Sequence, residues 1–244
     1  MTPIVTTISL ARHRMRDPRQ ILTLPGFGLL VSLSIALAFA AYTQAKPNTP
    51  GLAPGGEFDA NRAFADLRCL ASFGPRPPAS QALEHSREFM AGELRAAGAT
   101  VALDSFTAST PLGPIPMTNL VAKIPSTSSA VVIIAGHYDT KRIDFPFVGA
   151  NDGGSSAAFL LEMARVLARR GNTVAYWPVF FDGEEALQRW SNTDGLPFNL
   201  YWHTRYDTVD KCNPASLAIV ARVVLATLAA LETTLPSRPG GASQ

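Results

Sequence analysis

The sequence predicts one α/β domain in which buried strands alternate with helices. Two uninterrupted apolar runs, AVVIIAGHYD (130–139) and TVAYWPVFFD (173–182), are typical of strands that are buried on both faces of a sheet. Between them, the segment 153–171 carries apolar residues at the spacing of a helix and ends at a glycine. This alternation of strand and helix favours an α/β sandwich.

Two helices and two strands are expected ahead of the first buried strand. Apolar residues recur at helical spacing over 58–74 and again over Gln81–Ala97, and each stretch ends at a glycine or just before one. The β-rich stretches 100–106 and 118–124 follow as strands. Between them, the proline-rich PLGPIPM (111–117) is expected to be a separating loop.

A long helix is expected near the C-terminus, over 213–234. Asn213 is a favoured capping residue, and Pro214 suits the first helical position because a proline lacks the N–H that would be unpaired there. The domain is therefore expected over 58–235, with 236–244 as a tail.

The N-terminal segment differs in composition from the rest of the chain. Residues 1–45 hold four arginines and one acidic residue, and the remainder carries a net charge of −1, which does not predict a basic surface for nucleic acid. The arginines precede an apolar run from Phe27 to Tyr42, a pattern typical of a signal peptide or a single membrane anchor. A linker rich in Pro and Gly follows over 46–57. Either interpretation makes the domain secreted, periplasmic or anchored by one N-terminal segment.

The chain has two cysteines, Cys69 and Cys212. Outside the cytoplasm they could pair, but two cysteines do not define a disulfide framework. They could equally be buried as small apolar side chains. The sequence leaves both alternatives open, and it does not indicate an oligomeric state.

Residues that could carry chemistry follow the ends of the buried strands, where ligands bind in such folds. The acidic and imidazole side chains at these positions are His137, Asp139, Asp152, Glu184, Glu185 and His203. Each alone has a structural explanation as a hydrogen-bonded histidine, a helix-terminal charge or a solvated turn. Together they place mixed carboxylate and imidazole donors at one edge of the sheet.

This combination predicts a zinc site. Zinc takes oxygen and nitrogen donors in tetrahedral geometry, and a catalytic zinc keeps three protein ligands and one open position. Asp152, Glu185 and His203 supply three such ligands. Glu184 then remains free to move protons. Asp139 or Asp207 could stand behind the ligands and orient them, above all the histidine.

Four motifs, AGHYDT, GANDGGSSAA, FFDGEEA and WHTRYDT, resemble in sequence and order the zinc aminopeptidase-type metallopeptidases, metallopeptidase family 28. HYDTK, EEALQRW and FGPRPPAS bring the resemblance closest to the glutaminyl-peptide cyclotransferases, and it covers about 58–231. The resemblance implies a zinc-exopeptidase-like three-layer sandwich around a mostly parallel or mixed sheet. It also implies one zinc for a cyclotransferase and two metals for an aminopeptidase.

The resemblance also implies roles for individual residues. The implied zinc ligands are Asp152, Glu185 and His203. Glu184 matches the catalytic acid/base, His137 the histidine that holds a second metal in aminopeptidases, with Asp139 beside it, and Trp190 and Trp202 match aromatic residues of the cyclase pocket. The implied activity is that of an acyltransferase that converts the N-terminal glutamine of a peptide substrate to pyroglutamate and releases ammonia.

One departure from the family is an unusually short connection. His203 follows Glu185 by eighteen positions, whereas the family has a much longer stretch there that includes another central strand. That stretch carries the remaining second-metal carboxylate of aminopeptidases and two aspartates of the cyclases. LPFNLYW (196–202) is a candidate for a short replacement strand at an edge. The sequence therefore leaves three alternatives: a cyclotransferase, an aminopeptidase, or an inactive remnant.

Overall fold

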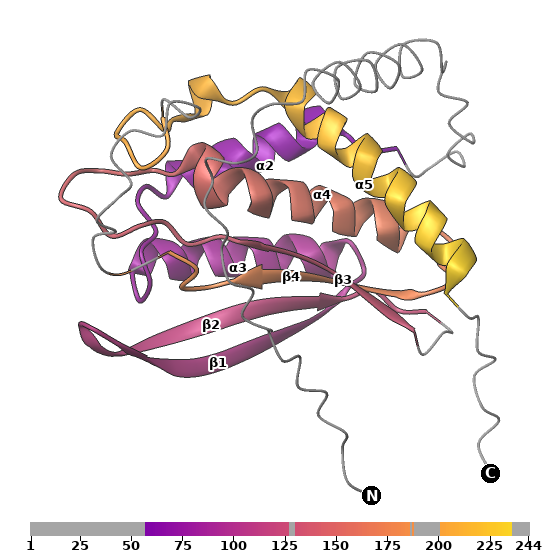
Figure 1. Cartoon of the computed structure of the whole chain (residues 1–244), viewed down its shortest axis with the longest axis horizontal. Helices are drawn as coiled ribbons and strands as arrows, with labels where there is room; N and C mark the ends of the chain where they lie inside the picture. The colour runs from indigo at the N-terminus through magenta and orange to yellow at the C-terminus, as the bar shows by residue number, and fades with distance from the viewer. Residues whose placement is uncertain (1–56, 127–129, 186, 188–200, 236–244) are drawn as a thin grey trace, which may run out of the picture. The chain divides into compact units, whose positions relative to one another are not determined.

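A computed structural model describes residues 57–126, 130–185, 187 and 201–235 (Figure 1). Its sheet has the strand order β1-β2-β4-β3. The strands are β1 (Thr100–Thr110), β2 (Gly113–Lys123), β3 (Val131–His137) and β4 (Ala175–Phe181). The β1–β2 and β2–β4 pairs are antiparallel, and β3 and β4 are parallel. The expected α/β fold with a mixed sheet is therefore confirmed. The signal or anchor segment, most of the linker, the tail and most of the candidate strand 196–202 lie outside the described residues.

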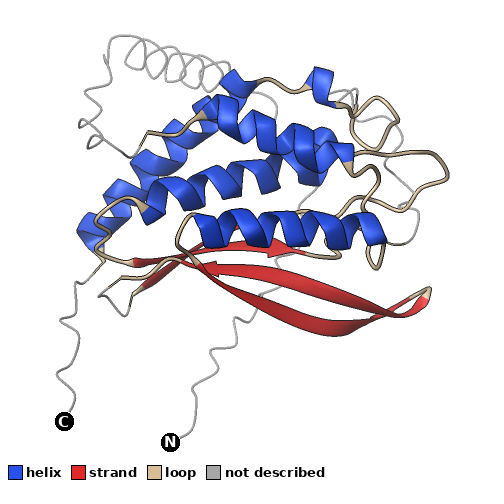
Figure 2. Cartoon of the chain, turned by 180° about the vertical axis from the view of Figure 1, so that it is seen from behind, coloured by secondary structure: helices blue, strands red, loops and turns tan. Residues whose placement is uncertain are grey.

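Four long helices cover one face of this sheet (Figures 1 and 2). They are α2 (Ala60–Ser72), α3 (Gln81–Ala96), α4 (Ser156–Ala168) and α5 (Pro214–Thr234). The side chains of Asp59, Ser80 and Asn213 accept hydrogen bonds from backbone N–H groups in the first turns of α2, α3 and α5, which fixes where these helices begin. Because α4 lies between the sheet and α2, it is apolar nearly all round and is buried almost throughout.

The hairpin of β1 and β2 is longer than the sequence predicts. The stretch 111–117, expected to be a loop, enters β2 at Gly113, and Pro114 and Pro116 pair opposite Ser109 and Thr107 of β1. The expectation of a separating loop was wrong. Prolines are tolerated there because β2 pairs with β4 only at Leu120 and Val121, so this part of β2 has β1 as its partner on one side alone.

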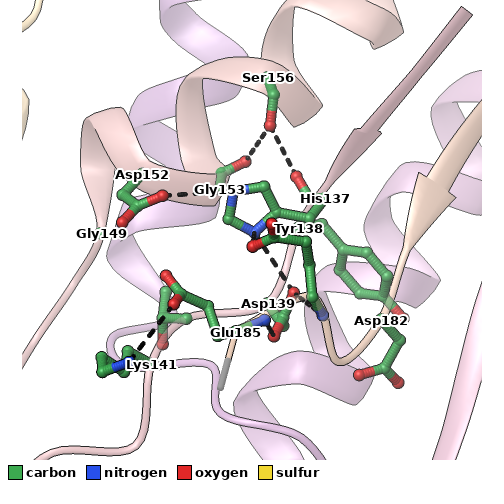
Figure 3. Close-up of polar contacts among 12 residues, drawn as sticks. His137, Tyr138, Asp139, Lys141, Gly149, Asp152, Gly153, Ser156, Asp182 and Glu185 are labelled. Carbon is green, nitrogen blue, oxygen red and sulfur yellow. Dashed lines mark hydrogen bonds and ion pairs between the residues drawn. The ribbon is translucent and has the colours of Figure 1, made fainter. Parts of the chain in front are cut away.

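The connection from β3 to α4 depends on a close approach. A Cβ atom at Gly136 would lie 2.9 Å from the Cβ of Ser156, so only glycine lets α4 pack this near to the strand. The Ser156 hydroxyl donates to the main-chain carbonyl of His137 at 2.7 Å (Figure 3). The start of α4 is thereby fixed against the end of β3.

A partly buried ionic network joins α2, α3 and α4. The guanidinium of Arg165 lies 2.5 Å from Asp66, 2.7 Å from Glu93 and 3.1 Å from Glu162. Glu162 is fully buried and also pairs with Arg62 at 2.6 Å. The network satisfies the charges that these helices bury, as burial of ionised groups requires.

α5 packs through Leu217, Ala221, Leu225 and Leu228, which are buried in the core. Within the part of the chain that the structure describes, α5 is also the one helix that is long and apolar enough to cross a membrane, by length and composition alone. Cys69 and Cys212 are half-buried free thiols.

Candidate metal centre

The candidate site lies where β3 and β4 end together. In the parallel register, His137 pairs with Phe181, and the Tyr138 N–H donates to the Phe181 carbonyl at 3.1 Å. His137 and Asp139 therefore leave the sheet at the same edge as Glu184 and Glu185. This edge is the one at which the alternation of strands and helices predicts a ligand site.

Asp139 holds the Glu184–Glu185 pair through its backbone. The Asp139 carboxylate is fully buried and accepts from the N–H groups of Glu184 at 3.3 Å and Glu185 at 3.2 Å. It also lies 3.3 Å from Nδ1 of His137. One carboxylate thus fixes the ends of both strands relative to each other.

Asp152 projects from an irregular turn, Ala150–Ser155, that leads into α4. Asp152 has extended backbone angles, and Gly153 follows with φ +80°. A Cβ atom on Gly153 would lie 2.3 Å from the main-chain oxygen of Asp139, so glycine is required there on both grounds. The glycine lets the Asp152 turn approach the end of β3 closely, as Figure 3 shows.

His203 comes from the turn that precedes α5. Its backbone is left-handed, with φ +54°, which is unusual for a residue other than glycine and is a common feature of functional sites. The imidazole stacks on Trp202 with 3.9 Å between ring centroids, and it forms a T-shaped pair with the Phe147 ring at 5.8 Å between centroids. These aromatic rings fix the plane of the imidazole.

Three candidate donors converge. One ligand atom each from Asp152, Glu185 and His203 lies within 4.8 Å of the others. Nε2 of His203 is 3.3 Å from Oδ2 of Asp152 and 3.2 Å from Oε2 of Glu185. The three residues come from separate segments, and the structure brings together the set that the sequence singled out.

A second group, His137, Glu184 and Glu185, also has one ligand atom each within 4.8 Å. His137 turns Nε2 toward Oδ1 of Asp152 at 3.3 Å, and its Nδ1 is 3.8 Å from Glu184. The Glu184 side chain is 59% exposed, so it can reach a ligand from the solvent side. Glu185 is common to both groups, which makes it the centre of the site.

A cavity of about 210 Å³ opens onto these groups. Its lining residues are His137, Lys141, Asp152, Glu184, Glu185, Trp202 and His203. Trp202 lines this cavity, whereas Trp190 lies outside the described residues. Lys141 was not singled out by the sequence, although it ends the HYDTK motif. It is buried, with Nζ 3.9 Å from Oε2 of Glu185 (Figure 3).

The electrostatics of the site suit a cation. Burial and the neighbouring Asp152 carboxylate raise the pKa of Glu185 to about 8. Burial opposes the ionisation of Asp152, but His137 outweighs it and lowers the pKa of Asp152. Burial would also lower the pKa of His137, yet its bonds to Asp139 and Asp152 raise that pKa to about 10. In the metal-free site, protons on Glu185 and His137 therefore offset the negative charge of the crowded carboxylates.

The donor chemistry fits zinc. Among the described residues, Oδ2 of Asp152 is a buried oxygen that accepts no hydrogen bond, and Nε2 of His203 lies 3.3 Å from it. Two carboxylates and one imidazole form a donor set that a catalytic zinc accepts, with a position left for substrate. Burial and the Lys141 ammonium lower the pKa of His203, so its imidazole is neutral, as a metal ligand must be.

This fold is of the zinc-exopeptidase-like α/β type, shared with a Zn-dependent exopeptidase from Parabacteroides distasonis at a TM-score of 0.52 and 26% identity, over 59% of this chain and 53% of that chain. Residues 119–196 match the model of peptidase family M28. A glutaminyl cyclase from an Acidobacteriales bacterium is 35% identical at a TM-score of 0.53, over 61% of this chain and 53% of that chain. The resemblance to this metallopeptidase family and its cyclotransferases is therefore confirmed.

Among curated proteins, the glutaminyl-peptide cyclotransferase-like protein of Bos taurus is 38% identical in an alignment of 133 residues that covers 50% of this chain and 35% of the relative. The match thus spans about a third of that relative's length. The family-model match at 119–196 includes the ends of β3 and β4 and the Asp152 turn. The activity of the whole relative is a hypothesis for this chain.

Proposed function

We propose that this chain is a zinc-dependent glutaminyl-peptide cyclotransferase with Asp152, Glu185 and His203 as its zinc ligands. The observation that carries the proposal is the convergence of these donors beside the free carboxylate of Glu184. The names of the most similar proteins support the choice of reaction. A cavity of about 210 Å³ is smaller than the roughly 300–1,000 Å³ of drug-sized sites, which suits a single terminal residue.

Asp152, Glu185 and His203 would hold the zinc ion, whose positive charge would polarise the side-chain carbonyl of an N-terminal glutamine. Glu184 takes a proton from the attacking α-amine. The amine nitrogen bonds to the side-chain carbonyl carbon, and the bond from that carbon to the amide nitrogen breaks. Glu184 returns the proton to the departing nitrogen, which leaves as ammonia, and the peptide keeps a pyroglutamyl end. Trp202, stacked on His203, forms an apolar wall for the glutamine methylenes.

The test is metal content together with ammonia release from a peptide that begins with glutamine. The same peptide with N-terminal asparagine is the control substrate, since its ring would have only four members. We expect about one zinc per chain. Glu184→Gln should keep the zinc and lose about 10²–10⁴-fold in turnover, the usual contribution of general acid/base catalysis. His203→Ala should lose the zinc. A wild-type chain without zinc, or one that cyclises neither peptide, refutes the proposal.

A zinc aminopeptidase is the second candidate, and the His137, Glu184 and Glu185 group favours it because it offers donors for a second metal. This alternative predicts about two zinc ions per chain and free amino acids rather than ammonia from unblocked peptides. The same samples therefore separate the two reactions.

We also propose that the domain acts outside the cytoplasm, secreted, periplasmic or anchored through its N-terminal segment. The arginines and the apolar run of residues 1–45 support this location. N-terminal sequencing of the protein from its native membrane and soluble fractions tests it: a chain that starts at Met1 in the cytosol contradicts the proposal.

A further inference from the structure

Asp207 contacts the turn that carries Asp152, not the histidine that it was expected to orient. Its carboxylate accepts from the N–H of Asn151 at 2.7 Å and from the N–H of Asp152 at 3.1 Å. Its main-chain carbonyl accepts from the N–H of Ala150 at 3.2 Å. One residue thus binds three successive amides of the turn.

The same residue belongs to the turn of His203. The Asp207 N–H donates to the carbonyl of Thr204 at 3.2 Å, which closes the chain just after the left-handed His203. Asp207 is only 1% exposed. Burial of a carboxylate is costly, and here backbone N–H groups supply the compensation. A buried charge whose hydrogen bonds all join two ligand-bearing turns indicates a positioning role.

The Asp152 turn is held from its other side by a buried cation. Arg76 is 1% exposed, and its guanidinium donates to the carbonyl of Gly149 at 3.2 Å and to that of Tyr138 at 3.3 Å. The residue before Ala150 is therefore tied to the end of β3, and the next three residues are tied to Asp207. Asp152 therefore has little freedom to move relative to the end of β3 or relative to Asp207.

We propose that Asp207 is the positioning residue that sets the separation of Asp152 and His203, so that the donor set does not depend on the length of the connection 186–200. The inference rests on the proposed metal site. Residues that orient metal ligands typically contribute about 10–100-fold to metal affinity. Asparagine at 207 would keep the shape of the side chain, but it would replace one accepting oxygen with an NH₂ group. That group cannot accept a hydrogen bond from the N–H of Asn151 or Asp152.

The test uses the full chain with Asp207→Asn, and with Asp210→Asn as the matched control. Asp210 lies three residues further on, and its side chain is 65% exposed. We expect Asp207→Asn to accelerate amide exchange at Ala150, Asn151 and Asp152 in the metal-free protein. It should also lower zinc affinity about 10–100-fold in chelator competition and alter the visible spectrum of the cobalt-loaded site. Asp210→Asn should do none of these.

A third variant inserts Gly-Ser-Gly-Ser after Asn192. It should keep the zinc affinity of the wild type within about threefold, since loop-closure cost changes slowly with length. Unchanged amide exchange in Asp207→Asn overturns the inference, whether or not the wild type binds zinc. A tenfold loss of affinity in the insertion variant also overturns it. If the wild type binds no zinc, only the proposed function is refuted. Amide exchange in the metal-free protein still tests the role of Asp207.

Discussion

Zinc affinity should depend steeply on pH through a single ligand, Glu185. Its pKa is raised to about 8, whereas the pKa values of Asp152 and His203 are lowered, so these two are already deprotonated near neutrality. A metal ligand must lose its proton before it binds. Zinc therefore competes with the Glu185 proton below pH 8, and affinity falls as the pH falls.

The magnitude follows from that pKa. At pH 8 about half of the Glu185 side chains are protonated, and at pH 6 about 99% are. The apparent affinity should drop roughly 50-fold between these values, or about 2 kcal/mol. Competition with a chelator, corrected for the chelator's own protons, measures this drop. A fall of less than fivefold would refute the argument.

A variant at Lys141 tests whether the pKa of Glu185 sets this pH dependence. Its ammonium lowers the pKa of Glu185, so Lys141→Met should move the midpoint of the pH dependence upward while it leaves the three ligands in place. Lys123→Met is the matched control, since Lys123 lies over Trp177 on the sheet. A midpoint that stays unchanged in Lys141→Met would show that another group sets the dependence.

Three further results are expected. Because the raised pKa of Glu185 keeps it protonated in the folded chain while it is ionised in the unfolded chain, the free energy of unfolding of the metal-free chain should fall as the pH rises from about 4.5 to 8. Urea titrations of Glu185→Gln should show a shallower slope, and the raised pKa values of His137 and Asp182 should leave the rest of it in place. Glu162→Ala should cost about 3 kcal/mol, since it breaks a buried ion pair of Arg165, whereas the more exposed Glu93→Ala should cost less than about 1 kcal/mol; equal costs in thermal unfolding would contradict this. Gly153→Ala should cost more than about 2 kcal/mol and most of the zinc, and a variant that keeps both would show that the turn relaxes freely.

The sequence predicts most of the fold because its signals are local. The apolar runs at 130–139 and 173–182 identify β3 and β4, and Asn213 with Pro214 marks the start of α5. The prolines of 111–117 led to the wrong prediction of a loop. Whether a strand tolerates them depends on whether β4 pairs beside them, and the local sequence does not show that pairing.

The candidate site divides in the same way. Motif order singles out Asp152, Glu185 and His203, and the structure brings them together. Nothing local to Lys141 or Asp207 predicts that the first lies beside Glu185 or that the second binds the turn of Asp152, because each contact joins segments 44 or more residues apart. Such contacts follow only from the packed fold.

The short connection between Glu185 and His203 is compatible with the site for a physical reason. The sixteen Cα–Cα steps from residue 185 to residue 201 could span roughly 50–60 Å when extended. This is far more than is needed to bring Nε2 of His203 within 3.2 Å of Oε2 of Glu185. A shorter loop also closes at lower entropic cost, about 0.6 kcal/mol less for each halving of its length. Among the described residues, Asp139, Asp207 and Arg76 hold the segments that carry the candidate ligands through hydrogen bonds to their backbone. Under the proposed function, we expect the short connection to affect substrate recognition more than metal binding, so this chain should show normal zinc content and a higher KM than relatives with the family's longer stretch.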